Sequence, residues 1–86
     1  MKQFNYVITE PVGIHARPAG LLAKAARECM PTVIYITKGT KTVKASQLLM
    51  LMGLGARKGD EVTVSAEGPD EEAAIAKMEA YFKENL

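Results

Sequence analysis

The sequence predicts an α+β fold in which helices lie on one face of a four-stranded sheet, forming an open sandwich. Two periodicities predict it. Four short segments are rich in β-branched and aromatic residues, and two longer segments repeat apolar residues at steps of three and four. With one short apolar helix added, the order is β-α-β-β-α-β-α. The same order also suits a ferredoxin-like domain with an extra short helix. Residues 1–86 suffice for one small domain and no more.

The first half of the chain predicts a strand, a helix and a β-hairpin. Residues 4–9 favour a strand through their β-branched and aromatic content. A helix follows over about 16–28, and Pro31 ends it because the residue before a proline avoids helical dihedral angles. Residues 32–37 form the clearest strand, and residues 40–45 return as its hairpin partner. The apolar stripe that we expect this helix to bury consists of Ala19, Leu22, Ala23, Ala26 and Met30.

The second half predicts a short helix, a strand and a longer helix. Residues 46–53 are apolar nearly all round, so a short helix there must leave some apolar side chains exposed. Residues 61–66 alternate between apolar and polar, as in a strand with one buried face. The last helix begins at residues 68–70 with acidic residues in its first turn. Its apolar stripe consists of Ala74, Ile75, Met78, Tyr81 and Phe82.

The composition indicates a globular protein without a membrane segment. Hydrophobic residues make up 48% and charged residues 24% of the chain, and no apolar run is long enough to cross a bilayer. The N-terminus lacks the apolar region of a signal peptide, so we expect a cytoplasmic location. Cys29 is the only cysteine, and we interpret it as a packing residue rather than a redox group. We expect no cofactor and no bound metal.

The charges are unevenly distributed although the net charge is only +1. Nine Lys or Arg and two Asp or Glu lie in residues 1–58, whereas two Lys or Arg and eight Asp or Glu follow. The near-neutral total argues against non-specific binding of nucleic acid. The two halves could simply form two solvated faces. Alternatively, the basic residues attract an acidic partner, and the candidates are Arg17, Lys24 and Arg27, with Arg57 and Lys58.

The segment Gly13–Gly20 contains the only histidine, at the predicted start of the first helix. Histidine has an unperturbed pKa of about 6.5, which keeps a neutral nucleophile common at physiological pH. Arg17 brings a permanent charge suited to phosphate oxygens, and Pro18 suits the first turn of a helix. The backbone amides of Ala16 and Arg17 would point toward an anion. These groups could hold a phosphoryl group on His15, although a histidine at a helix start is often only a cap or a solvated side chain.

The segment Gly13-Ile14-His15-Ala16-Arg17-Pro18-Ala19 resembles the active-site signature of HPr, the histidine-containing phosphocarrier family of the bacterial phosphoenolpyruvate-dependent sugar phosphotransferase system. The resemblance covers essentially the whole chain in the order of the family. It implies the family's antiparallel, open-faced sandwich. Further matching segments are Lys41-Thr42-Val43, Leu54-Gly55, Gly59-Asp60-Glu61-Val62-Thr63-Val64 and the acidic last helix.

The resemblance implies a carrier and not an enzyme. In the family, enzyme I passes a phosphoryl group from phosphoenolpyruvate to Nδ1 of the histidine that matches His15, and enzyme IIA domains of sugar permeases receive it. Arg17 and the Ala16 amide would bind the phosphoryl group. The family docks its partners around the first helix and on an apolar patch of the short helix. By position, the candidate partner-binding residues are Lys24, Arg27, Leu48, Leu49 and Met52.

Many members of the family also carry a serine that HPr kinase phosphorylates. Counting without gaps from His15 places Ser46 at that site. Anchoring on the segments around residues 41–43 and 54–55 places Gln47 there instead, and this alignment keeps the apolar positions of the short helix in phase. Ser46 would then serve mainly as the N-cap of that helix, and regulation by HPr kinase would be in doubt.

Two rival functions are compatible with the residues. A regulatory or interaction module could retain the fold while His15 is only a surface residue. A domain that binds a small ligand or RNA predicts neither the pairing of His15 with Arg17 nor the near-neutral charge. We expect a monomer, since a carrier that visits two partners should leave its active face free. Which sugar permease would be served is not encoded in these residues.

Overall fold

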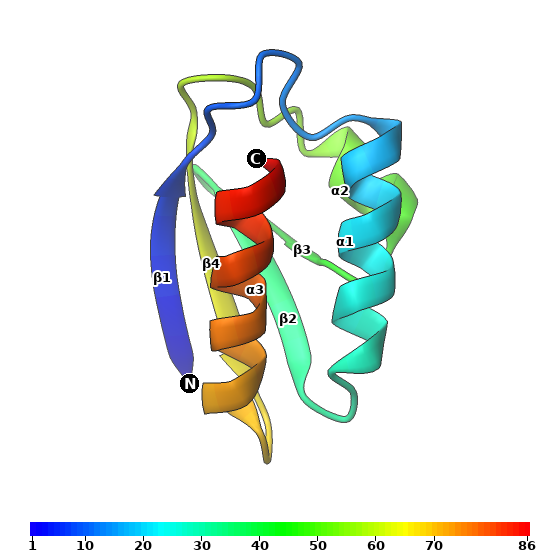
Figure 1. The fold of residues 1–86 in the computed structure, drawn as a ribbon, viewed down its shortest axis with the longest axis vertical. Coiled ribbons are helices and arrows are strands. Elements are labelled where there is room, and N and C mark those ends of the chain that lie inside the picture. Colours follow the sequence, from blue (N-terminus) through cyan, green and yellow to red (C-terminus); the bar gives the residue numbers. More distant parts are fainter.

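The computed structural model describes residues 1–86 and contains the predicted order of elements (Figure 1). The four strands form one antiparallel sheet in the order β1-β4-β2-β3, and the helices cover one face of it. Helix α3 packs on β1 and β4, and α1 lies between α3 and α2. The elements are β1 (Lys2–Val7), α1 (Ala16–Glu28), β2 (Val33–Lys38), β3 (Lys41–Lys44), α2 (Leu48–Gly53), β4 (Glu61–Glu67) and α3 (Glu71–Asn85).

Strand β4 is central because it pairs with β1 on one side and β2 on the other. Its apolar residues Val62, Val64 and Ala66 face the helices and are buried, as the alternation predicts. Ser65 faces the other way, yet it is only 7% exposed. Its cross-strand neighbours are Gln3 and Tyr35, so a central position covers a side chain that alternation alone predicts to be exposed.

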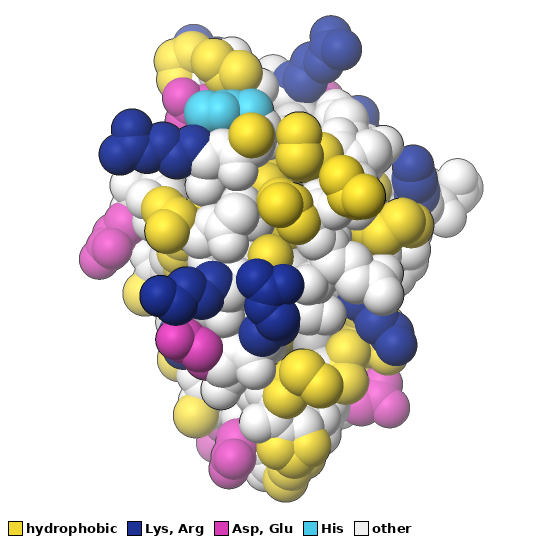
Figure 2. Space-filling view, turned by 90° about the vertical axis from the view of Figure 1, so that its right-hand side faces the viewer, with side chains coloured by type: hydrophobic (Ala, Val, Ile, Leu, Met, Phe, Trp, Pro, Cys, Tyr) yellow, Lys and Arg dark blue, Asp and Glu magenta, His cyan; other side chains and the backbone are white.

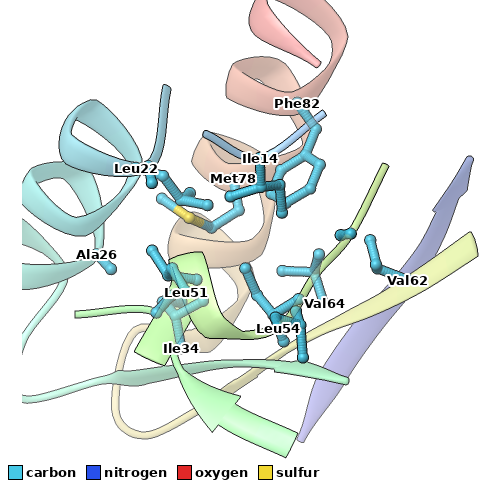
Figure 3. Close-up of a cluster of buried hydrophobic side chains, with 14 of the residues drawn as sticks. Ile14, Leu22, Ala26, Ile34, Leu51, Leu54, Val62, Val64, Met78 and Phe82 are labelled. Carbon is cyan, nitrogen blue, oxygen red and sulfur yellow. The ribbon is translucent and has the colours of Figure 1, made fainter. Parts of the chain in front are cut away.

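The core lies between the sheet and the helices (Figure 3). Phe82 of α3 is fully buried and makes edge-to-face contacts with Phe4, Tyr6 and Tyr81 at ring-centroid distances of 5.8, 5.4 and 6.3 Å. Such contacts add to the stabilisation that burial of the ring provides. Both predicted helical stripes face this core, except for Met30. Buried side chains that Figure 3 labels are Ile14, Leu22, Ala26, Ile34, Leu51, Leu54, Val62, Val64, Met78 and Phe82.

Three local predictions are wrong. The first strand covers Lys2–Val7, not residues 4–9, because its limits follow the register with β4. Met30 is 62% exposed, because α1 ends at Glu28 and the helical period no longer applies. The N-cap of α2 is Gln47, not Ser46, and no side chain bonds the first turn of that helix.

Cys29 is partly buried against the core, as expected for a packing residue. Its Sγ lies 3.4 Å from the carbonyl oxygen of Ala25, to which it donates a weak hydrogen bond. No helix has both the length and the apolar character needed to cross a membrane.

Candidate functional site

His15 ends the loop between β1 and α1 and is the N-cap of α1. Its backbone is extended, and its carbonyl accepts the first helical hydrogen bond from Ala19 at 2.8 Å. The first amides of a helix have no intrahelical acceptor, and no other carbonyl or side chain bonds those of Ala16 and Arg17. Pro18, which has no amide, follows them and is buried. The helix therefore presents two free N–H groups directly after the histidine.

A close backbone contact holds the loop that precedes His15. Gly13 has φ +79° and lies against residues 56 and 57, so that a Cβ at Gly13 would lie 2.6 Å from Cα of Arg57 and closer still to the carbonyl oxygen of Ala56. The adjacent Ile14 donates its N–H to that carbonyl at 3.0 Å and buries its side chain. Only glycine combines this φ with this approach. The position of His15 is thus fixed by the turn that precedes β4.

Glu10 shapes the same loop, and the sequence reasoning missed it. One carboxylate oxygen, Oε2, accepts hydrogen bonds from the N–H groups of Val12 at 2.8 Å and Gly13 at 2.7 Å. The same oxygen lies 3.8 Å from Nε2 of His15. The sequence did single out this residue, since Glu10 is the only acidic residue before Glu28. Its proximity to the imidazole depends on the turn and cannot be found from spacing.

The imidazole of His15 lines a shallow depression of about 280 Å³. Its side chain is 40% exposed, and its Nδ1 has no hydrogen-bond partner in the protein. Arg17 lines the same depression, is exposed and makes no ion pair. A cation that has no carboxylate partner is available to an incoming anion. The other lining residues are Glu10, Pro18, Leu21 and Asn85.

A larger hollow, of about 490 Å³, lies on the sheet face that the helices leave open. It is lined mainly by threonines and other uncharged residues, including Thr37, Thr42 and Thr63, and contains no histidine or cysteine. Chemistry therefore favours the smaller depression at His15. No cluster of three or more His, Cys, Asp or Glu side chains could hold a metal ion.

The candidate partner-binding residues lie on the side of the molecule where α1 and α2 meet the solvent (Figure 2). In this view hydrophobic side chains spread below the cyan histidine, and Lys and Arg side chains lie among them. Leu48, Leu49 and Met52 are all exposed, Leu49 at 81%. Core packing, which could have buried two of the three, is instead provided by Leu51 and Leu54.

The two basic candidates on α1 are both exposed but differ in their contacts. Lys24 makes no hydrogen bond or ion pair. Arg27 donates from Nη1 to the carbonyl oxygen of Ser46 at 3.1 Å and so ties α1 to the segment before α2. Of the two candidate regulatory residues, Ser46 is half-buried and Gln47 is exposed.

The exposed residues Arg57 and Lys58 belong to the turn that supports Gly13. Asp60 holds this turn by accepting the N–H of Arg57 at 2.9 Å, and its carboxylate lies 3.2 Å from Nζ of Lys38. The hydrogen bond from Arg57 and then the Lys38 ammonium lower the pKa of Asp60. Lys38 also donates to the carbonyl of Gly55 at 2.9 Å. The turn at residues 56–60, which the ion pair between Asp60 and Lys38 stabilises, therefore supports the loop between β1 and α1, called the histidine loop below.

Known proteins with similar sequences and folds include phosphocarriers. The sequence model of the family described as "PTS HPr component phosphorylation site" matches residues 2–84. The phosphocarrier protein HPr of Mycoplasma genitalium is 39% identical over 99% of this chain and 97% of its own. The crystal structure of HPr from Thermoanaerobacter tengcongensis superposes with a TM-score of 0.87 at 38% identity, covering all of both chains. This match decides in favour of the open-faced sandwich over the ferredoxin-like alternative.

Two of the similar structures bear on oligomeric state. One is a dimer of HPr from Thermoanaerobacter tengcongensis, which is 36% identical with a TM-score of 0.76, over 98% of this chain and 95% of its own. Crh of Bacillus subtilis, a catabolite-repression protein, is 34% identical with a TM-score of 0.77, over 100% of this chain and 98% of its own. It was solved as a dimer with a swapped domain. The expectation of a monomer therefore does not extend to every protein of this fold.

Proposed function

The chain belongs to the HPr family of the phosphotransferase system, and on that premise we propose that it carries a phosphoryl group on Nδ1 of His15. In this proposal phosphorylated enzyme I is the donor, and enzyme IIA domains of sugar permeases are the acceptors. The observation that carries the proposal is the histidine itself. Its ring is partly exposed, with a free Nδ1, at the start of a helix whose first two amides have no partner.

The chemistry follows from these groups. The lone pair of Nδ1 attacks phosphorus, and the bond between phosphorus and the donor's leaving atom breaks. The Ala16 and Arg17 amides, the positive end of α1 and the Arg17 guanidinium offer donors and charge to the phosphoryl oxygens. An exposed site of this kind binds the group loosely enough for a partner to take it. The protein is a stoichiometric carrier in this scheme and not an enzyme.

Partner binding is part of the proposal. The exposed side chains of Leu48, Leu49 and Met52 form an adaptable apolar patch, and Lys24 and Arg27 supply positive charge on the adjacent helix. We place this exchange in the cytoplasm. Regulation by HPr kinase is not included, because the alignment that keeps the short helix in phase places Gln47, which has no hydroxyl group, at the site of the phosphorylated serine.

Intact-protein mass after incubation with phosphoenolpyruvate and enzyme I tests the proposal. We expect the gain of one phosphoryl group, which brief acid treatment removes because phosphohistidine is acid-labile and phosphoserine is not. His15→Ala should gain none, whereas Cys29→Ser, far along the chain from the site, should gain the same mass. No gain by the natural protein, with enzyme I shown active on another carrier, would favour the regulatory or interaction module.

A further inference from the structure

We propose that Glu10 is a positioning residue that keeps the ring proton of His15 on Nε2 and so leaves Nδ1 free to take the phosphoryl group. The inference rests on the proposed function for its consequence, but not for its geometry. The observation is the 3.8 Å distance between Oε2 of Glu10 and Nε2 of His15, on the side of the ring away from Nδ1.

The carboxylate is fixed in place before any partner arrives. Two backbone N–H groups, of Val12 and Gly13, bond the same oxygen that faces the imidazole. The Gly13 amide also points at the carbonyl oxygen of Glu10, at 3.0 Å, which closes the turn. The glycine that completes this turn is locked against residues 56 and 57. The negative charge near Nε2 is therefore part of a rigid loop and not of a mobile surface side chain.

A fixed carboxylate selects between the two neutral forms of imidazole. It stabilises the form whose N–H points toward it and destabilises the form that turns a lone pair toward it. The other polar side chains lining the depression carry no negative charge: Arg17 is a cation, and Asn85 is a neutral amide that donates to the carbonyl of Tyr81. Glu10 is thus the one anionic side chain that lines the depression, and it favours the tautomer with the lone pair on Nδ1.

The same charge assists both directions of transfer. When Nδ1 bonds phosphorus, the proton remains on Nε2 and the ring becomes a cation, which the carboxylate of Glu10 offsets. On delivery the bond between nitrogen and phosphorus breaks, its electron pair returns to Nδ1, and the ring leaves as neutral imidazole. No ring proton has to be moved in either step. Without the carboxylate, loss of the Nε2 proton from the phosphorylated ring would leave an imidazolate as the leaving group, which is far poorer.

Nitrogen-15 NMR of the His15 ring, recorded over a series of pH values, distinguishes the two neutral forms and tests the pairing directly. Glu10→Gln keeps an oxygen acceptor for the two turn amides and removes only the charge. We expect the ratio of the Nε2–H to the Nδ1–H form to fall by roughly three- to tenfold, the effect of one charge at this distance in a partly solvated site. Glu79→Gln, an exposed change on α3, should leave the ratio unchanged.

Phosphoryl transfer is the second measurement. After phosphorylation with enzyme I, Glu10→Gln should lose its phosphoryl group to water or to an enzyme IIA domain several-fold more slowly, and Glu10→Asp should recover part of the rate. A tautomer ratio and transfer rates of Glu10→Gln equal to those of the natural protein would overturn the inference. Glu10 would then only stabilise the turn, and Glu10→Ala alone would differ. If the natural protein takes no phosphoryl group, the proposed function fails, and the NMR ratio still decides the role of Glu10.

Discussion

Replacing Gly13 with alanine should destabilise the fold more than the same substitution at Gly39. The site combines two penalties. A positive φ of +79° is unfavourable for a residue with a side chain, and the new Cβ would lie 2.6 Å from Cα of Arg57. Gly39 has a φ of +60°, and no atom lies within 4 Å of the position that a Cβ would take there. It therefore isolates the first penalty and serves as the matched control.

The two penalties contribute separately to the free energy of unfolding. A left-handed conformation costs alanine about 1–2 kcal/mol, and the loss of chain entropy in the unfolded state returns roughly 0.5–1 kcal/mol. Gly39→Ala should thus lower the free energy of unfolding by about 1 kcal/mol. Overlap with an immobile backbone adds about 1–3 kcal/mol, so Gly13→Ala should lose about 3 kcal/mol in all. Gly20, which is helical and open to solvent on its Cβ side, should gain about 0.5–1 kcal/mol on replacement by alanine.

Urea unfolding monitored by circular dichroism measures all three variants. With a slope of roughly 1 kcal/mol per molar urea, the midpoint should fall by about 3 M for Gly13→Ala and by about 1 M for Gly39→Ala. Equal midpoints for these two variants would refute the reasoning, since the contact with residues 56 and 57 would then contribute nothing. In that case the histidine loop would be held by its hydrogen bonds alone.

Three further substitutions test other parts of the structure. Because the pKa of Asp60 is lowered in the fold, by the Arg57 amide first, its contribution is complete above about pH 4 and disappears as the pH falls through the lowered pKa. Asp60→Asn should therefore lower the urea midpoint at pH 7, and by less and less as the pH falls below about 4. Burial raises the pKa of Tyr81, so its contribution is present below about pH 10 and is lost at higher pH. In alkaline titrations followed by fluorescence, Tyr81→Phe should remove this loss, while at pH 7 the missing hydrogen bond to Pro18, 2.6 Å long, costs about 1 kcal/mol. Phe82→Ala should cost about 3–5 kcal/mol in calorimetry, and a loss below about 1 kcal/mol would contradict its central place in the core.

The helices of this fold were predictable from local information. The stripe from Ala19 to Ala26 is set by helical geometry, and the bounds of α1 agree with the prediction. The ends of the strands were harder to predict from the sequence. Strand β1 covers Lys2 to Val7 because these are the residues that pair with β4. The burial of Ser65 was missed for the same reason. The alternation of apolar and polar residues within one strand does not show that the strand lies between two others.

The sequence predicted the reactive residues of the candidate site, but not the residues that hold them in position. His15, Arg17 and the helix start follow from a short segment, and the structure places them around one depression. Glu10 was missed because its contact with His15 arises from a turn that Val12 and Gly13 close through their amides. The separation of five residues between Glu10 and His15 does not by itself predict that the carboxylate lies near one nitrogen of the ring. The functional roles of all these residues stay predictions until the experiments above are done.

The order of the strands also affects how the protein is made. The histidine leaves the ribosome early, but the bonds that hold its loop are made to residues that are translated much later. Ile14 bonds the carbonyl of Ala56, and Ile8 bonds that of Asp60. Strand β1 itself pairs only with β4. A nascent chain therefore exposes an unpaired first strand until β4 has emerged, and the loop that holds His15 reaches its final geometry near the end of synthesis rather than at its start.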